Sequence, residues 1–239
     1  MSKQFPPVQG GGSLMVAWQV RQKNVLVIGG GEVAASRILH ALNADANVTV
    51  ICPRSGLNDE VSYRISEGQV KHIDRTFEPQ DLDHADMVLS AIDDAATSTK
   101  ISQLCRERRI PVNIADVPAE CDFFFGSVHR DGPLQVMVST NGNGPKMASI
   151  VRKQVAEALP EGTGEAVEKV GVLRKKLREV APDAAEGAKR MRWISKVCDS
   201  WSLKDLVDMT EKDMNTLLKN YYELGQVPSL EQVRQKASS

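Results

Sequence analysis

The chain has 239 residues, 26% of them charged, and a formal net charge of −1. This length suits one large domain or two modest domains with cores of their own. The balanced charge argues against a nucleic-acid-binding protein, which usually carries a basic excess, and the sequence has no apolar run of about 18 residues that would predict a membrane span.

The amino-terminal half alternates short apolar runs with helical patterns. Residues 1–13 lack the apolar core of a signal peptide and predict a loose tail. The run NVLVIGG at 24–30 ends at glycines, which is typical of a buried parallel strand, and helical spacing follows at 32–44. This alternation predicts a doubly wound α/β sheet. Further strands are expected at 47–52, 69–74, 86–92 and 111–116, with a helix at 97–109.

A hairpin is expected next. Two β-rich runs flank residues 129–133 and place Asp131-Gly132 at the turn between them. A helix should then begin near Pro145 and end at Pro160.

The last third of the chain is predicted to be helical. Residues 161–165 are expected to form a hinge, and Thr210 with Asp213 should form a capping box. Two apolar stripes indicate the buried faces of the helices: Val167, Val170, Leu173, Leu177 and Val180, then Met191, Ile194, Val197 and Trp201. The expected domains are residues 1–117, 118–160 and 161–239.

The segment GGGEVA has the spacing Gly29-x-Gly31-x-x-Ala34. In a dinucleotide-binding loop the first glycine permits a tight turn, the second lets the pyrophosphate approach the backbone, and the small third residue lets helix and strand pack closely. The helix start would then offer free N–H groups to the phosphates. The alternative is a glycine turn that serves packing alone. The predicted cofactor-binding residues here are Gly29, Gly31, Glu32, Val33 and Ala34.

The acid that usually holds the ribose hydroxyls is absent from its expected place. It should lie about 20 residues further on, at the end of the second strand, where this chain has Cys52-Pro53-Arg54. Pro53 and Arg54 are predicted to border the cofactor. Arg54 suits a 2′-phosphate, which would indicate NADP, but it is equally a solvated surface arginine, so the residues leave NAD and NADP open.

Ala91 and Asp93 follow the strand predicted at 86–92 and are expected to border the cofactor by position. Asp93 is a second candidate for a catalytic base, with a helix N-cap as the alternative role.

The cysteines and histidines form no recognisable metal motif. The four cysteines contain no CxxC pair, and the four histidines make no HxxxH or HExxH pattern. A preformed metal cage is therefore not predicted, and scattered thiols fit a reducing cytoplasm better than disulfides.

Three segments together resemble the siroheme synthase family, in its fungal-type bifunctional form: GGSLMVAWQVRQKNVLVIGGGEVAASR, NIADVPAECDFFFG and VMVSTNGNGPKMASIVRKQV. Weaker similarity continues through KVGVLRKKLREVAPD. The resemblance implies an NAD-binding Rossmann domain, a central dimerisation region built on the hairpin, and a helical carboxyl-terminal domain, assembled as a homodimer.

The resemblance also implies a chemistry. The family's enzymes oxidise precorrin-2 to sirohydrochlorin with NAD⁺, and the bifunctional members then insert Fe²⁺ to form siroheme, with Co²⁺ as another possible metal substrate. A family aspartate serving both steps falls on Asp116. A carboxylate at the carboxyl end of a strand is well placed to accept protons. On the residues alone, Asp116 is as well explained as an N-cap or turn residue before Val-Pro, and Asp122 is expected to be structural.

The tetrapyrrole would lie against several other residues. Phenylalanines 123–125 can pack beside a flat macrocycle, although a place in the hairpin core is equally expected for two of them. Precorrin-2 carries eight carboxylates, some of which a helix amino end with Lys146, Arg152 and Lys153 could bind. A plain helix start with a solvated basic face is an equal alternative for these three basic residues. The predicted substrate-binding residues are Asn113, Phe124, Ser139, Thr140, Asn141, Gly142 and Lys146.

Two alternative functions remain at this point. The chain has no histidine after His129, so no histidine of the helical domain serves metal insertion, and a dehydrogenase without chelatase activity is one alternative. The other is a regulatory module that binds NAD and does no chemistry.

Overall fold

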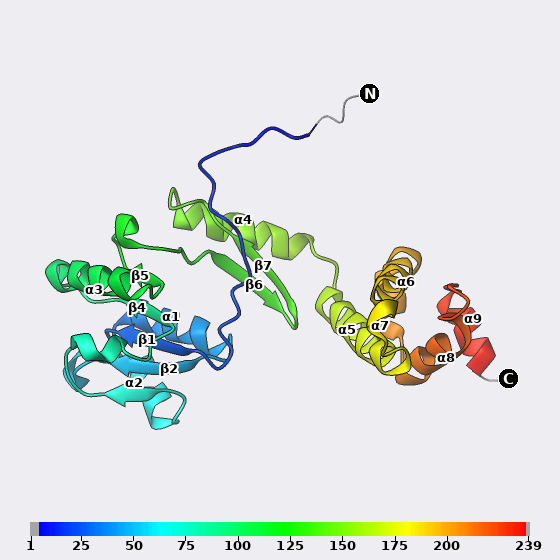
Figure 1. The fold of residues 1–239 in the computed structure, drawn as a ribbon, viewed down its shortest axis with the longest axis horizontal. Helices are drawn as coiled ribbons and strands as arrows, with labels where there is room; N and C mark the ends of the chain where they lie inside the picture. The colour runs from blue at the N-terminus through cyan, green and yellow to red at the C-terminus, as the bar shows by residue number, and fades with distance from the viewer. Residues whose placement is uncertain (1–4, 238–239) are drawn as a thin grey trace. The chain divides into compact units, whose positions relative to one another are not determined.

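The structure is a computed structural model that describes residues 5–237. Its contacts divide the chain into two units. The first unit runs to Phe125 and takes in Asn141–Asn143, and the second comprises Gly126–Thr140 and the residues from Gly144 onward. Each unit is described by itself (Figure 1).

The first unit is built on a five-stranded parallel sheet with the strand order β3-β2-β1-β4-β5. This order, with the reversal between β1 and β4, is that of a dinucleotide-binding Rossmann sheet, and it confirms the α/β prediction. The strands are β1 (Asn24–Ile28), β2 (Asn47–Ile51), β3 (Lys71–Ile73), β4 (Met87–Ser90) and β5 (Val112–Ile114).

Helices cover both faces of this sheet (Figure 1). In β1, Val25 and Val27 belong to the same buried cluster as Ile38 of α1 (Glu32–Leu42) and Val61 of α2 (Asp59–Ser66). The alternate residues Leu26 and Ile28 join Ile101 and Cys105 of α3 (Ala95–Arg108) in a second cluster. A strand buried on both faces needs a continuous apolar run rather than alternation, which is the pattern that β1 has.

Two details of the first unit differ from the sequence expectation. Helix α2 was not assigned from sequence; the side chain of Asn58 starts it by accepting the N–H of Val61. Helix α3 is capped by Asp94, whose carboxylate accepts the N–H groups of Ala96 and Thr97. The capping role considered for Asp93 therefore belongs to its neighbour.

The hairpin prediction is confirmed. Strands β6 (Ser127–Asp131) and β7 (Leu134–Val138) pair antiparallel, with Gly132 and Pro133 between them. Gly132 has a φ of +53°, which glycine adopts at little cost, and Pro133 supplies the fixed negative φ that follows. Helix α4 (Pro145–Ala158) has proline in its first turn as predicted.

The rest of the second unit is helical. Its core gathers Leu173 and Leu177 of α5 with Trp193, Leu217 and Tyr222. The helices are α5 (Thr163–Val180), α6 (Gly187–Ser200), α7 (Leu203–Asp208), α8 (Glu211–Tyr221) and α9 (Leu230–Ala237). Among residues 5–237, no helix is long and apolar enough to cross a membrane.

Three expectations for these helices are decided by the structure. The capping box of Thr210 and Asp213 is confirmed at the start of α8. The hinge expected at 161–165 is wrong in its second half, because α5 already begins at Thr163. The apolar stripes were drawn too wide: Val167, Val180 and Met191 are among the exposed hydrophobic residues.

Candidate functional site

The loop after β1 is shaped for close approach of another molecule. Gly29 has a φ of +114°, and a Cβ there would lie 2.2 Å from the carbonyl oxygen of Ala91, so only glycine fits. At Gly31 a Cβ would meet no atom of the described residues within 4 Å. The space in front of Gly31 is therefore open, as a pyrophosphate requires, while Gly29 is fixed by packing against the loop after β4.

The start of α1 offers backbone donors. Gly31 is its N-cap, and no side chain of the described residues caps the helix, so the first N–H groups, those of Glu32, Val33 and Ala34, face no competing acceptor. Ala34 is fully buried against the sheet and Val33 is exposed. The predicted cofactor-binding residues of this loop thus form one continuous stretch of backbone at the helix start, the candidate phosphate cradle.

The loop after β4 lies directly beside this cradle. The N–H of Ala91 donates to the carbonyl of Ile28 (2.8 Å), at the end of β1. Asp93 is exposed and follows at the same edge of the sheet. Both residues stand where a bound dinucleotide would cross the strand-order reversal.

At the end of β2, Cys52 is buried and its thiol donates to the carbonyl of Pro53 (3.3 Å). Burial raises the pKa of this thiol, and the nearby charge of Asp74 adds to the effect. Arg54 is exposed and paired with Asp74, with 2.8 Å between its Nε and the carboxylate oxygen.

Asp116 lies two residues beyond the end of β5, in a turn. It is exposed and has a φ of +60°, a left-handed conformation that aspartate and asparagine tolerate better than other non-glycine residues. Since β5, β4 and β1 are parallel neighbours, Asp116 and the glycine loop share the carboxyl edge of one sheet. This is the edge at which such sheets bind ligands.

Hydrogen bonds of the Cys121 and Asp122 side chains hold the turn that carries Asp116. The thiol of Cys121 donates to the carbonyl of Ile114 (3.1 Å) and accepts its N–H (3.3 Å). The carboxylate of Asp122 accepts the N–H of Val112 (3.0 Å), which is the structural role expected for this second acid. Burial raises the pKa of the Cys121 thiol, so the thiol stays protonated in this turn.

The side chain of Asn113 also helps to hold this part of the chain in place. It is 4% exposed, and its side-chain amide donates to the carbonyl of Phe123 (2.8 Å). Its position on β5 thus holds the chain that returns past Asp116.

The phenylalanines alternate in exposure. Phe123 and Phe125 pack against the core of the first unit, with Trp18 meeting Phe123 edge-on at 5.4 Å between ring centroids. Phe124 between them is 40% exposed. The expectation that two of the three lie in the hairpin core is wrong, because β6 begins only at Ser127. Phe124 alone presents a free face.

Sequence reasoning missed Arg37. Its guanidinium carbon lies 4.0 Å above the ring centroid of Phe125, and its Nε is buried without a hydrogen-bond partner among the described residues. Burial lowers the pKa of Arg37, while the negative charge of Asp116 acts in the opposite direction. The sequence shows a basic residue in the second turn of the helix that follows the glycine loop. Only the folded structure shows that this half-buried cation lies near Asp116.

The segment between β7 and α4 holds the other predicted substrate residues. The hydroxyl of Thr140 accepts the N–H of Gly144 (3.1 Å), and Ser139, Thr140 and Lys146 belong to the second unit. Asn141 and Gly142 have φ values of +52° and +83° and are grouped with the first unit. Lys146 is exposed in the first turn of α4.

The amino-terminal tail reaches this segment. Residues 5–13 are irregular as predicted, whereas residues 1–4 of the predicted tail lie outside the described residues. The hydroxyl of Ser13 nevertheless donates to the side-chain oxygen of Asn141 (2.5 Å), and the Asn141 amide donates to the carbonyl of Gly11 (3.0 Å). The tail is thus tied to the loop that precedes α4.

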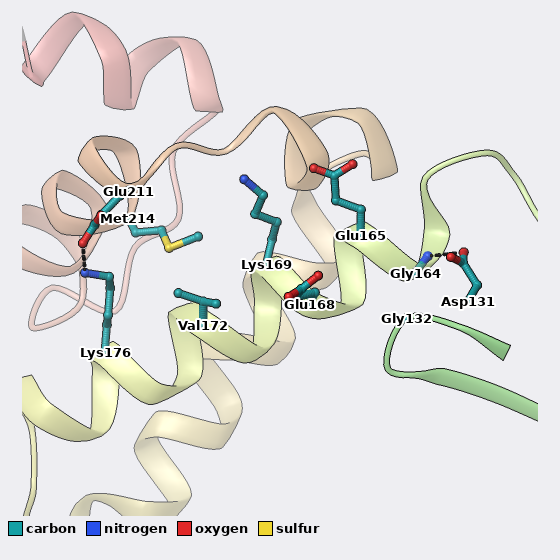
Figure 2. Close-up of a pocket in the computed structure, with 10 residues that line it drawn as sticks. All are labelled: Asp131, Gly132, Gly164, Glu165, Glu168, Lys169, Val172, Lys176, Glu211 and Met214. Carbon is teal, nitrogen blue, oxygen red and sulfur yellow. Dashed lines mark hydrogen bonds and ion pairs between the residues drawn. The ribbon is translucent and has the colours of Figure 1, made fainter. Parts of the chain in front are cut away.

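A pocket of about 640 Å³ lies elsewhere, within the second unit (Figure 2). It contains none of the predicted site residues and has acidic and basic groups side by side, with Lys176 paired to Glu211 at 2.7 Å. Its lining residues are Asp131, Gly132, Gly164, Glu165, Glu168, Lys169, Val172, Lys176, Glu211 and Met214. Among residues 5–237, no cluster of three or more histidine, cysteine or acidic side chains could hold a metal ion.

Three family models match successive parts of this chain. Residues 16–127 match a family model described as "Putative NAD(P)-binding", residues 131–158 match "Sirohaem biosynthesis protein central", and residues 160–228 match "Sirohaem biosynthesis protein C-terminal". The chain is 52% identical over 219 residues to the siroheme biosynthesis protein met8 of Schizosaccharomyces pombe, covering 91% of this chain and 83% of that protein. The chain belongs to the siroheme biosynthesis protein family.

More distant members of the siroheme family are longer. The siroheme synthase of Methylobacillus flagellatus is 34% identical over 152 residues, which make up 64% of this chain and 32% of that protein. The siroheme synthase of Thioalkalivibrio sulfidiphilus is 34% identical over 168 residues, 70% of this chain and 34% of that protein. The chain thus spans about a third of these bacterial relatives.

A solved structure shares the fold. SirC, a precorrin-2 dehydrogenase, superposes with a TM-score of 0.68 at 18% sequence identity, over 87% of this chain and 100% of that one. This likeness confirms the architecture of a parallel sheet, a β-hairpin and a helical region.

Proposed function

We propose that this chain oxidises precorrin-2 to sirohydrochlorin with NAD⁺ and then inserts Fe²⁺ to form siroheme. The observation that carries the proposal is the position of Asp116 on the same sheet edge as an open, uncapped glycine loop. Membership of the siroheme family supports the choice of a tetrapyrrole as the substrate.

The residues present fit a dinucleotide. The open space at Gly31 and the free N–H groups of α1 would hold the pyrophosphate, and Ala91 and Asp93 would border the rest of the cofactor. When bound, NAD⁺ supplies the acceptor for the hydride that leaves precorrin-2.

Asp116 would accept the proton that leaves in the same oxidation. Loss of a hydride and a proton converts precorrin-2 to sirohydrochlorin, and an exposed carboxylate at this edge can act as the base. In the second reaction Fe²⁺ replaces two pyrrole protons, and the same carboxylate would take them in turn. The metal enters as substrate, and Co²⁺ has the charge and ligand preferences to replace it.

The carboxylates of the tetrapyrrole need cationic and N–H partners. We assign them to Lys146 and the uncapped start of α4, with Ser139, Thr140, Asn141 and Gly142 in the preceding loop. Phe124 would lie against the macrocycle, while Asn113 would act indirectly by holding the returning chain.

We further propose that the protein is a homodimer joined through the hairpin and α4. Val128 and Met137 are directly opposed on the hairpin, and each is 39% exposed. Helix α4, which packs on the hairpin, also has exposed apolar residues: Met147, Ile150 and Val151. Such a grouping is typical of an interface, and light scattering of the purified chain and of Val128→Glu would measure the oligomeric state. Four free thiols agree with residence in a reducing cytoplasm.

The decisive experiment adds precorrin-2 and NAD⁺ to the purified protein, then Fe²⁺ under anaerobic conditions, and follows the absorption spectrum. Asp116→Asn is the variant to compare, because asparagine tolerates the φ of +60° and removes only the charge. Asp45→Asn is the matched control, because Asp45 is an exposed aspartate with the same φ of +60° and lies at the opposite edge of the sheet.

We expect the wild type to form sirohydrochlorin and to accelerate siroheme formation over a protein-free control, and Asp116→Asn to lose both activities. If iron enters no faster than without protein, the chain is a dehydrogenase only. If NADH binds while no tetrapyrrole is converted, the chain is a dinucleotide-binding module and the catalytic proposal is wrong.

A further inference from the structure

Asp74 lies at the carboxyl edge of the sheet, where the sequence offered no acid to bind the cofactor ribose. The usual ribose-binding acid is missing after β2. The thiol of Cys52 cannot replace it, because the thiol is buried, donates a hydrogen bond to the carbonyl of Pro53 and has a raised pKa that keeps it protonated. Asp74 comes directly after β3, whose last residue Ile73 pairs with Ile51 of β2. Parallel strands end at the same edge of a sheet, so Asp74 lies beside the loop that follows β2.

The carboxylate of Asp74 reaches into that loop. One oxygen accepts the backbone N–H of Arg54 (2.9 Å), and the other accepts its side-chain Nε (2.8 Å). The hydrogen bond from the Arg54 backbone, together with the adjacent guanidinium, lowers the pKa of Asp74. The group is therefore a fixed anion over the end of β2, the position from which a Rossmann acid meets the ribose.

This loop is in contact with the phosphate cradle. The N–H of Asn58 donates to the carbonyl of Gly30 (2.8 Å), and a Cβ on Gly30 would lie 2.8 Å from the carbonyl of Gly56 and 2.9 Å from the Cys52 sulfur. The segment that carries Arg54 is thus packed against the glycine loop. A dinucleotide with its pyrophosphate at Gly31 would extend its adenosine ribose over this segment.

We propose that Asp74 selects the dinucleotide that lacks a 2′-phosphate, by holding Arg54 and by accepting a ribose hydroxyl. This inference rests on the dinucleotide binding of the proposed function. A carboxylate has about four acceptor sites, and Arg54 uses two of them. The Asp74 side chain is 46% exposed, so its remaining acceptor sites can be reached by a hydroxyl.

A 2′-phosphate would be rejected at the same place. It carries roughly −1.5 to −2 charges at neutral pH, and like charges placed together at a binding site are strongly unfavourable. Arg54 is the cation that could receive this phosphate, but the Asp74 carboxylate offsets its charge and orients it through the bond to its Nε. Removal of the carboxylate charge would convert Arg54 from an orienting partner into a 2′-phosphate ligand.

The test is fluorescence titration of the full chain with NADH and NADPH at one fixed ionic strength. The variants are Asp74→Asn and the double variant Asp74→Asn with Arg54→Gln. Asp45→Asn is the matched control: Asp45 forms an exposed pair with Arg21 (3.0 Å) just before β2, at the opposite edge of the sheet, and asparagine tolerates its φ of +60°.

We expect the wild type to bind NADH at least about tenfold more tightly than NADPH, and Asp74→Asn to reduce that ratio by about tenfold, chiefly by a gain in NADPH affinity. The double variant should lose the NADPH gain, and Asp45→Asn should keep the wild-type ratio. A wild type that prefers NADPH, or an unchanged ratio in Asp74→Asn, overturns the inference while leaving dinucleotide binding intact. Failure of the wild type to bind either nucleotide overturns the proposed function itself, and this inference with it.

Discussion

The guanidinium of Arg37 lies 4.0 Å above the ring centroid of Phe125, within electrostatic range of Asp116. Arginine stays protonated at neutral pH even in a partly buried site, and no ion pair with Arg37 is present in the described residues. Charged side chains are seldom buried without a partner. The proposed substrate has eight carboxylates and would supply such a partner, so we expect Arg37 to bind one of them beside Asp116.

Arg37→Met should therefore weaken the use of precorrin-2 without disturbing the cofactor. We expect the KM for precorrin-2 to rise by about tenfold, the loss of one charge-assisted contact. Arg37→Lys should restore part of this affinity because it keeps the charge without the planar fork. Steady-state kinetics with saturating NAD⁺ measures both variants.

The fold should tolerate this change. Methionine removes a buried Nε that has no partner, which offsets the loss of a cation–π contact worth roughly 0.5–1 kcal/mol. Equal KM values for the wild type and Arg37→Met, with unchanged NADH affinity, would show that Arg37 serves packing against Phe125 alone.

The sequence was sufficient for the features set by local pattern. The apolar runs gave β1, β2 and β4, the glycine spacing gave the loop at Gly29 and Gly31, and the turn residues gave the hairpin. These features depend on hydrophobic burial and backbone conformation, which neighbouring residues determine.

Features set by distant contacts were missed. Asp74 follows a strand of three residues, and only the sheet order brings it to Arg54. Arg37 meets Phe125 because the chain returns past β5 to the side of α1, which no local spacing indicates. The wide apolar stripe on α5 failed for the same reason, since the face that is buried depends on which helices pack against it.

The two glycines of the phosphate loop should respond differently to alanine. Gly31→Ala should leave the fold within about 1 kcal/mol of the wild type, because its Cβ meets nothing within 4 Å and the N-cap loss is small. It should weaken NADH binding by about tenfold or more, since the methyl group occupies the space for the pyrophosphate.

Gly29→Ala should instead destabilise the first unit by more than about 2 kcal/mol, through its φ of +114° and the 2.2 Å approach to Ala91. NADH titration and thermal unfolding separate the two effects; wild-type NADH affinity in Gly31→Ala would argue against a pyrophosphate at this loop.

Gly164 and Gly171, both on α5, offer a matched pair for stability. A Cβ on Gly164 would lie 2.4 Å from the carbonyl oxygen of Asp131, which lies at the hairpin turn. The carboxylate of Asp131 accepts the Gly164 N–H (2.8 Å; Figure 2). Gly164→Ala should therefore cost about 1–3 kcal/mol. Gly171 is exposed with nothing within 4 Å of its Cβ position, so Gly171→Ala should gain about 0.5–1 kcal/mol from helix propensity. Urea unfolding followed by the fluorescence of Trp193 and Trp201 measures both changes, and equal effects of the two variants would contradict the packing argument.

Asp213 should make the helical region sensitive to acid. Burial alone would raise the pKa of this carboxyl, but the hydrogen bonds from Thr210 and the charge of Arg234 outweigh it, and the net pKa is lowered. A carboxyl with a lowered folded pKa stabilises the fold above its unfolded pKa of about 3.9, and this stability is lost as the pH falls through the folded value. Asp213→Asn should therefore cost about 1–3 kcal/mol at pH 7, and the difference from the wild type should shrink below about pH 4.

The second capping box of the region provides the control for this prediction. Asp205 forms the same pattern with Ser202 but is less buried than Asp213, so Asp205→Asn should cost only about 0.5–1 kcal/mol at pH 7. Urea unfolding at pH 7, 5 and 3 compares the variants. A constant difference between the wild type and Asp213→Asn across this range would mean that Asp213 stabilises α8 through packing rather than charge, because only the charged form accepts all four hydrogen bonds from Thr210 and Arg234 at full strength.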